Sequence, residues 1–273
     1  MDITTTPNAL TAPRSGTGPA FRGVRWNGWT LTALAILCFL GFVVVQTGLL
    51  FWVLFHDYPD LVHHWSRLAQ DFANPSFLIN LLTAKNLWIT SVGSEAVLGL
   101  MTVGLAQLAF RATPSDLGLV GRLRWRWLLW GIAAGVAVFA ASNVVEVLMK
   151  GIFGSHPQPQ TLVLAKHHGF VDLALDFMSV SVAAPVAEEI FFRGFLFTGL
   201  VQRMSPLLAM AITGICFGFA HLDPWSFLPI CTIGFGLAWT FYATRSLWVN
   251  IVAHATVNTI SLIAVYTWPQ LVK

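Results

Sequence analysis

The feature of this sequence that most restricts its fold is a run of 25 residues, from Leu31 to Phe55, without a charged side chain. At about 1.5 Å per residue, a helix of this length crosses a bilayer with some tilt. Comparable apolar runs follow, and neither an internal repeat nor a soluble domain separates them. We therefore predict an all-α, polytopic membrane helical bundle of about seven transmembrane helices, or at most eight. The further predicted spans are 87–110, 127–149, 171 to about 200, 206–221, 227–243 and 247–265.

The composition supports a lipid environment and argues against nucleic-acid binding. Hydrophobic residues make up 56% of the chain and charged residues only 10%, so the sequence cannot cover a soluble surface of ordinary polarity. The formal net charge of +3 comes without a basic stripe interleaved with aromatic residues. We expect the lipid bilayer to be a partner and nucleic acid not to be one.

The charge distribution predicts how the chain is oriented. Residues 1–30 are polar and rich in Thr, Pro and Gly, so we expect a flexible cytoplasmic amino-terminal tail. Residues 31–273 would then form a single transmembrane domain. With the tail inside, most arginines lie on the inner side, including those between 111 and 126, as the positive-inside rule requires. The sequence thus predicts an integral protein of the plasma (inner) membrane with a cytoplasmic amino terminus.

Two adjacent carboxylates in the fourth predicted span need an explanation, because ionisable groups at membrane depth are costly unless paired or hydrated. Glu189 and Arg193 are spaced i, i+4 with the acid first, which favours a helical ion pair. Glu188 projects about 100° away from Glu189 and is left free to act as a general base. Pro185 removes a backbone donor and should open the helix near Ser181. The plainer alternative is a structural Glu–Arg pair that packs two helices.

Two histidines distinguish themselves from the other six by position. We expect the six to lie in outer loops or at their edges, where adjacent histidines are usually solvated: His56, His63, His64, His156, His167 and His168. His221 and His254 instead lie in or at the ends of apolar spans, and Asn258 follows His254 by one helical turn on the same face. A lone membrane histidine usually bonds a neighbouring helix. Two of them with an asparagine and the Glu-Glu-Arg motif are better explained by one polar site.

The order of these motifs resembles that of the CPBP family, which includes CAAX prenyl proteases and bacteriocin-processing (ABI-like) proteins. That family is marked by Glu-Glu-x-x-x-Arg, then Phe-x-x-x-His, then His-x-x-x-Asn on successive helices. The matching residues here are Glu188, Glu189 and Arg193; Phe217 and His221; His254 and Asn258. The resemblance covers about residues 170–265, which we expect to be the protease-like core.

The resemblance implies an intramembrane endopeptidase with a polar cavity among its helices. Glu188 would activate water, and His221 and His254 would bind a metal or polarise the peptide. Asn258 would stabilise the oxyanion, supported by Glu189 and Arg193. Members of the family are described both as metalloproteases and as glutamate-type proteases. A divalent metal, with zinc favoured and His221, His254 and Glu188 as its ligands, therefore stands beside the alternative of no metal.

Two other functions fit parts of the sequence. A membrane scaffold or immunity protein could keep this fold and bind a partner without cleaving it. A proton-coupled transporter could use Glu95 of the second span as a relay, although the absence of inverted repeats in the sequence argues against it. For a protease, the expected partner is a membrane-embedded or lipid-modified peptide or protein. The sequence identifies neither the substrate, nor its prenylation, nor the oligomeric state.

Overall fold

The computed structural model describes residues 24–59, 75–119, 125–156 and 158–268, and these form helices and connecting loops without a strand. Six helical segments are long and apolar enough to cross a membrane, and a seventh is apolar but shorter. The predicted all-α bundle of about seven helices is confirmed. The six are α1 (Gly28–Asp57), α5 (Ala84–Phe110), α6 (Trp125–Phe153), Phe170–Leu200, α12 (Phe227–Thr244) and α13 (Leu247–Thr267), and the shorter one is α11 (Pro206–Ala220).

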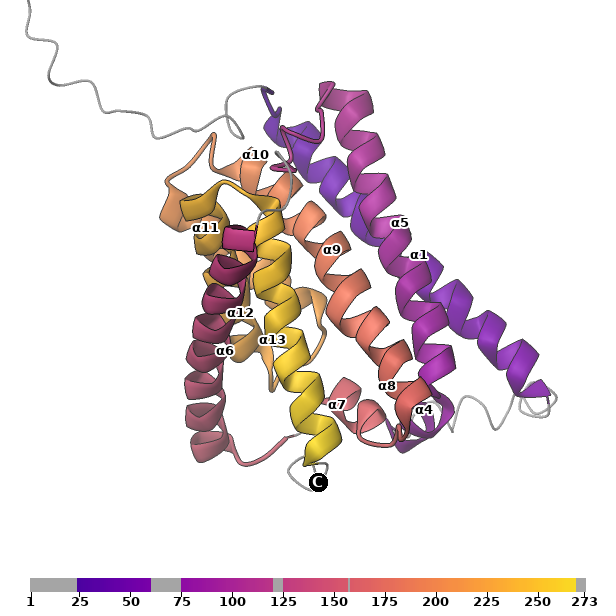
Figure 1. Cartoon of the computed structure of the whole chain (residues 1–273). Coiled ribbons are helices and arrows are strands. Elements are labelled where there is room, and N and C mark those ends of the chain that lie inside the picture. The colour runs from indigo at the N-terminus through magenta and orange to yellow at the C-terminus, as the bar shows by residue number, and fades with distance from the viewer. Residues whose placement is uncertain (1–23, 60–74, 120–124, 157, 269–273) are drawn as a thin grey trace, which may run out of the picture.

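Two short helices, α4 (Pro75–Leu81) and α7 (Pro159–Leu164), cap one end of the bundle. Figure 1 shows that the start of α8 (Phe170–Asp176) and the carboxyl-terminal part of α13 lie at this same end. We call it the α4–α7 end. The start of α1 and the end of α5 lie at the opposite end. Of the predicted tail, residues 1–23 lie outside the described part of the chain, and α1 begins at Gly28.

The outer surface of the bundle is apolar because its surroundings are lipid. Large side chains such as Val44 on α1, Leu108 on α5 and Val147 on α6 are exposed. A helix satisfies its backbone hydrogen bonds internally, which is why helices of this composition are stable in hydrocarbon. The helices pack against one another through their inner faces, where Phe191, Phe195 and other buried side chains form the main core.

The segment Phe170–Leu200 is one continuous helix with two wide stretches. α8 leads into the π-helical η2 (Phe177–Ala183), then α9 (Ala184–Glu189), then the π-helical η3 (Ile190–Phe197) and α10 (Thr198–Leu200). Pro185 cannot donate a backbone hydrogen bond, and the ladder widens before it, as predicted. Wide turns of this kind are frequent at functional sites. α9, the short α-helical stretch between the two π-helical ones, ends with the two adjacent glutamates.

α9 lies between α5 and α13 in the middle of the bundle (Figure 1). α11 and α12 pack beside η3, with their own backbones close together. A Cβ on Gly234 would come within 2.8 Å of Gly214 Cα, so only glycine allows this approach. The close packing leaves the Gly234 carbonyl within reach of the helix that carries the glutamates.

Candidate active site

The ion pair predicted from the spacing of Glu189 and Arg193 is present and fully buried. Arg193 Nη1 donates to Glu189 Oε1 at 2.7 Å, and both side chains have zero exposure. Arg193 Nη2 donates to the Gly234 carbonyl at 2.9 Å, and the guanidinium lies 4.8 Å from the centre of the Phe217 ring. A buried charge needs this degree of compensation. The pair joins η3 to α11 and α12 and gives the Glu189 carboxylate a buried counter-charge.

Two residues of α13 also bind Glu189. His254 Nδ1 lies 2.8 Å from Glu189 Oε1, and the Asn250 side-chain amide donates to Oε2. Asn250 was missed from the sequence, although it precedes His254 by the same four residues by which Asn258 follows it. Glu189 thus accepts hydrogen bonds from three side chains on two helical segments. This arrangement makes it the structural centre of the site.

Glu188 faces the other nitrogen of the same imidazole. Its Oε2 lies 3.9 Å from His254 Nε2, and its side chain is 16% exposed, whereas Glu189 is fully enclosed. An ionised Glu189 only accepts, so Nδ1 of His254 carries the hydrogen and Nε2 of the neutral ring is an acceptor. The distance from Glu188 is too long for a direct hydrogen bond and suits a water held between the two groups.

His221 lies at the edge of this group rather than within it. It is the C-cap residue of α11, is exposed, and its Nδ1 contacts the Phe217 carbonyl at 2.8 Å. The Phe217 ring lies 4.8 Å from the His221 ring and 5.6 Å from the His254 ring, measured between centroids. At 15 residues α11 is about 22 Å long, which is shorter than the roughly 30 Å of a full membrane span.

The predicted zinc site requires Glu188, His221 and His254 to bind one ion together. A catalytic zinc needs three protein ligands at about 2.0–2.2 Å from the ion for nitrogen and oxygen donors. Glu188 and His254 approach one point, but no group of three His, Cys, Asp or Glu side chains among the described residues could hold an ion. In this arrangement His221 does not complete the predicted set of three ligands.

Asn258 is directed to the neighbouring helix. Its Nδ2 donates one hydrogen bond to the Val180 carbonyl of η2 at 2.7 Å. A wide π-helical stretch leaves such carbonyls available, and the amide keeps a second hydrogen. The contact ties α13 to η2 one turn away from His254.

Glu95 approaches the site from α5, which lies outside the three motifs. It is buried, and its Oε2 has no hydrogen-bond partner in the described structure. The charged group that interacts with it electrostatically is Glu188. Gly99, one turn along α5, lies against Ala187, where an added Cβ would be 3.6 Å from the Ala187 Cβ. This close crossing explains how the Glu95 side chain reaches α9.

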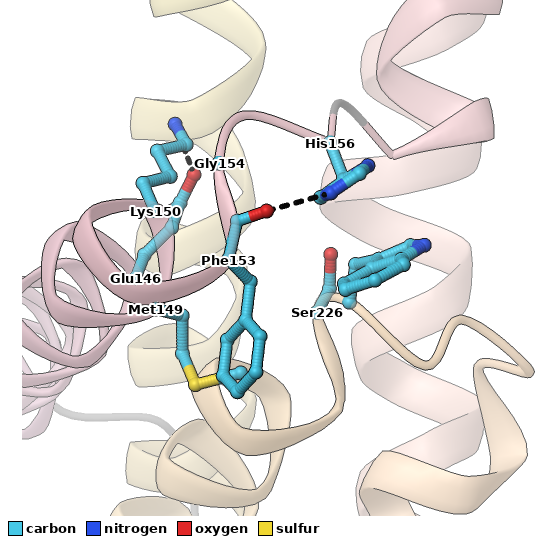
Figure 2. A pocket seen from close by; sticks show the side chains of 8 residues that line it. Glu146, Met149, Lys150, Phe153, Gly154, His156 and Ser226 are labelled. Atoms are coloured by element: carbon cyan, nitrogen blue, oxygen red, sulfur yellow. Dashed lines mark hydrogen bonds and ion pairs between the residues drawn. The ribbon is translucent and has the colours of Figure 1, made fainter.

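Two hollows on the described surface lie away from the glutamates. A small cavity of about 20 Å³ lies where the end of α6 meets the loop that holds Ser226, and Figure 2 shows the side chains that line it. His156 stacks there on Trp225, with ring centroids 3.8 Å apart. A larger apolar hollow lies between α11 and α12, near Trp239. Neither is lined by a candidate site residue.

Comparison with known proteins finds similarity to the part of the chain that carries the three motifs. Residues 170–260 match the family described as type II CAAX prenyl endopeptidase Rce1-like, and all six candidate site residues lie within them. A Bacillus subtilis (strain 168) protein named "Putative membrane peptidase YdiL" is 26% identical over 191 residues, covering 67% of this chain and 73% of that protein.

A second Bacillus subtilis protein, "Uncharacterized protein YyaK", is 26% identical over 148 residues, which are 50% of this chain and 47% of that protein. No solved structure matches the chain. The resemblance predicted from the three motifs is confirmed: residues 170–260 match the model of the Rce1-like family.

Proposed function

We propose that this protein is an intramembrane endopeptidase that hydrolyses a peptide bond of a membrane-associated protein or peptide. The observation that carries the proposal is the position of the His254 ring between two adjacent glutamates, 2.8 Å from Glu189 and 3.9 Å from Glu188. One carboxylate orients the imidazole, and the other is left to accept a proton. This division of roles is what a water-activating site requires.

In the proposed reaction, water lies between Glu188 Oε2 and His254 Nε2. Glu188 takes a proton from this water as the oxygen attacks the peptide carbonyl, and later returns it to the leaving amine. Burial strengthens the electrostatic effect of each group. The second Asn258 hydrogen would stabilise the developing oxyanion, and His221 at the edge of the site would polarise the peptide, as the resemblance implies.

The substrate class follows from the surroundings of the site. Its residues lie on helices that cross the membrane, so a substrate peptide must itself be embedded in or anchored to lipid. The family name points to prenylated carboxyl-terminal peptides, and we include these as one substrate class to be tested.

The experiment is cleavage of membrane-anchored peptides by purified protein in lipid, read by mass spectrometry. Prenylated and unprenylated forms of each peptide would be compared. Glu188→Gln should lower turnover by about 10² to 10⁴, the usual contribution of a general base, with folding preserved. Glu146→Gln, which removes an exposed carboxylate from α6, is the matched control and should keep activity.

A scaffold or immunity protein would bind peptides without products, and Glu188→Gln would then leave binding unchanged. Products formed equally well by wild type and Glu188→Gln would show that this glutamate is not the base.

A further inference from the structure

α13 and the helix from α8 to η3 run antiparallel and are joined by polar contacts at several levels. We call this row of contacts the polar seam. Successive residues of α13 bind residues that come progressively earlier in the other helix. The contacts are Asn250 and His254 with Glu189, Asn258 with Val180, and Tyr266 with Asp176. The seam fixes how far α13 can slide or turn against the helix that carries Glu188.

The seam ends in a buried cluster at the α4–α7 end of the bundle. Asp176, the last residue of α8, is fully buried. Its Oδ2 accepts a hydrogen bond from the Tyr266 hydroxyl at 2.6 Å and lies 2.9 Å from His167 Nδ1. His167 Nε2 lies 3.0 Å from the Leu82 carbonyl oxygen. We expected His167 on a solvated loop, and this prediction was wrong because both of its ring nitrogens have partners inside the protein.

The geometry requires a proton between His167 and Asp176. A carbonyl oxygen only accepts, so His167 Nε2 must carry a hydrogen to bind Leu82. If Nδ1 carried none, its lone pair would face the lone pairs of Asp176 Oδ2. One shared proton removes this repulsion, and it makes the contact an ion pair of imidazolium and carboxylate or a neutral acid–imidazole pair.

Apolar packing surrounds the cluster and raises the cost of losing that proton. Five buried hydrophobic residues from α5, α7 and α13 enclose this end of the bundle: Leu87, Val163, Leu164, Leu262 and Val265. Without the proton, the Asp176 carboxylate would keep only the Tyr266 hydroxyl, because its Oδ1 has no hydrogen-bond partner in the described structure. Unpaired charges in such places are strongly destabilising.

Other charged groups near His167 are few. Asp172 on α8 accepts from the His168 backbone N–H, and Lys166 donates to Asn80 on α4. Lys85 at the start of α5 is exposed, and the described parts of α4 and α7 contain no titratable residue. Burial opposes the charged imidazolium, but the hydrogen bonds to Asp176 and Leu82 and the nearby acidic groups together raise the pKa of His167.

We propose that His167, Asp176 and Tyr266 form a proton-holding anchor that sets the register of α13 against the α8–η3 helix. Through that register, these positioning residues hold His254 opposite Glu188. Tyr266 follows His254 by 12 residues on one unbroken helix, so a shift at the anchor moves the imidazole with it. The effect on catalysis rests on the proposed function, whereas the effect on stability does not.

The first test removes one hydroxyl from the anchor. Tyr266→Phe should lower kcat about tenfold with KM nearly unchanged, because small misplacements of catalytic groups reduce the rate more than binding. Tyr58→Phe is the matched control: its hydroxyl donates at 2.9 Å to the neutral Leu81 carbonyl near the same end, outside the seam. It should leave kcat unchanged. A Tyr266→Phe variant with wild-type kcat would overturn the positioning role.

The second test follows the melting temperature in detergent as pH changes. A group whose pKa is raised by folding stabilises the protein below its unfolded pKa, near 6.5 for histidine, and loses this contribution as pH rises through the folded value. Wild type should therefore lose stability above about pH 6.5. His167→Gln should melt lower at pH 6 and show a smaller decrease with rising pH.

Equal pH dependence in wild type and His167→Gln would overturn the proton-holding anchor, whatever the peptidase assays show. If the pH dependence differs but no peptide is cleaved by wild type, the anchor stands and the proposed function fails. The two proposals can therefore be rejected separately.

Discussion

Replacing Glu189 by glutamine is the sharpest test of the site, because this carboxylate accepts from three side chains at once. Gln keeps the shape of the side chain and removes the charge that compensates Arg193, which has zero exposure. The Gly234 carbonyl and the Phe217 and Phe192 rings would remain near the guanidinium, and none of them carries a charge. The new amide nitrogen would also oppose the donors of Asn250 or His254.

The expected loss of stability is large for a single-atom change. Removing one partner of a buried ion pair costs about 3–5 kcal/mol. For a chain of this size, 1 kcal/mol corresponds to about 2–4 °C in melting temperature. Glu189→Gln should therefore melt roughly 6–20 °C lower than wild type, and activity should fall with folding.

Thermal unfolding in detergent, followed by circular dichroism, measures this loss. The matched control is Glu146→Gln, because Glu146 and Lys150 form an i, i+4 pair of the same length, 2.7 Å, with both side chains at least 40% exposed. Such exposed pairs contribute at most about 1 kcal/mol. The double variant Glu189→Gln/Arg193→Met should recover part of the loss, because it also removes the uncompensated charge. The reasoning is refuted if Glu189→Gln melts with wild type or if the double variant is no more stable.

Three further predictions address other parts of the molecule. Chelators should leave turnover unchanged, since the described residues bring together only two of the three predicted ligands. If the purified protein contained stoichiometric zinc and lost turnover when the zinc was removed, the predicted zinc site with three ligands would be supported instead. Glu95→Gln should not lower the melting temperature, because it removes a buried carboxylate with an unpartnered oxygen; a marked decrease would reveal an unrecognised partner. A cysteine at Arg122 should react only with reagents that reach the cytoplasm, as the positive-inside rule predicts, and labelling from outside would reverse the orientation.

The sequence predicts contacts within one helix better than contacts between helices. The Glu189–Arg193 pair follows from helical periodicity alone, and the widened turns near Pro185 follow from its missing N–H. The approach of His254 to Glu189 depends on how α13 packs on α9. Only the order of three motifs indicated it.

The residues missed from the sequence have partners that are distant along the chain. Asn250 is hydrogen-bonded to a residue 61 positions earlier, and Tyr266 to one 90 positions earlier. Local periodicity carries no information about such pairs. His167 was misplaced for a related reason, since its loop position gives no sign of its partners, Asp176 and the Leu82 carbonyl.

The short α11 has a consequence for the lipid around the site. Its 15 residues span about 22 Å, whereas the hydrocarbon layer is about 30 Å thick. Such hydrophobic mismatch is relieved by local thinning of the bilayer or by polar groups that reach toward the headgroups. The loop after α11 carries the polar residues His221 and Asp223, which would draw water into such a thinned region. Peptide hydrolysis consumes one water per bond, and the mismatch would supply it from the side of the membrane on which α11 ends.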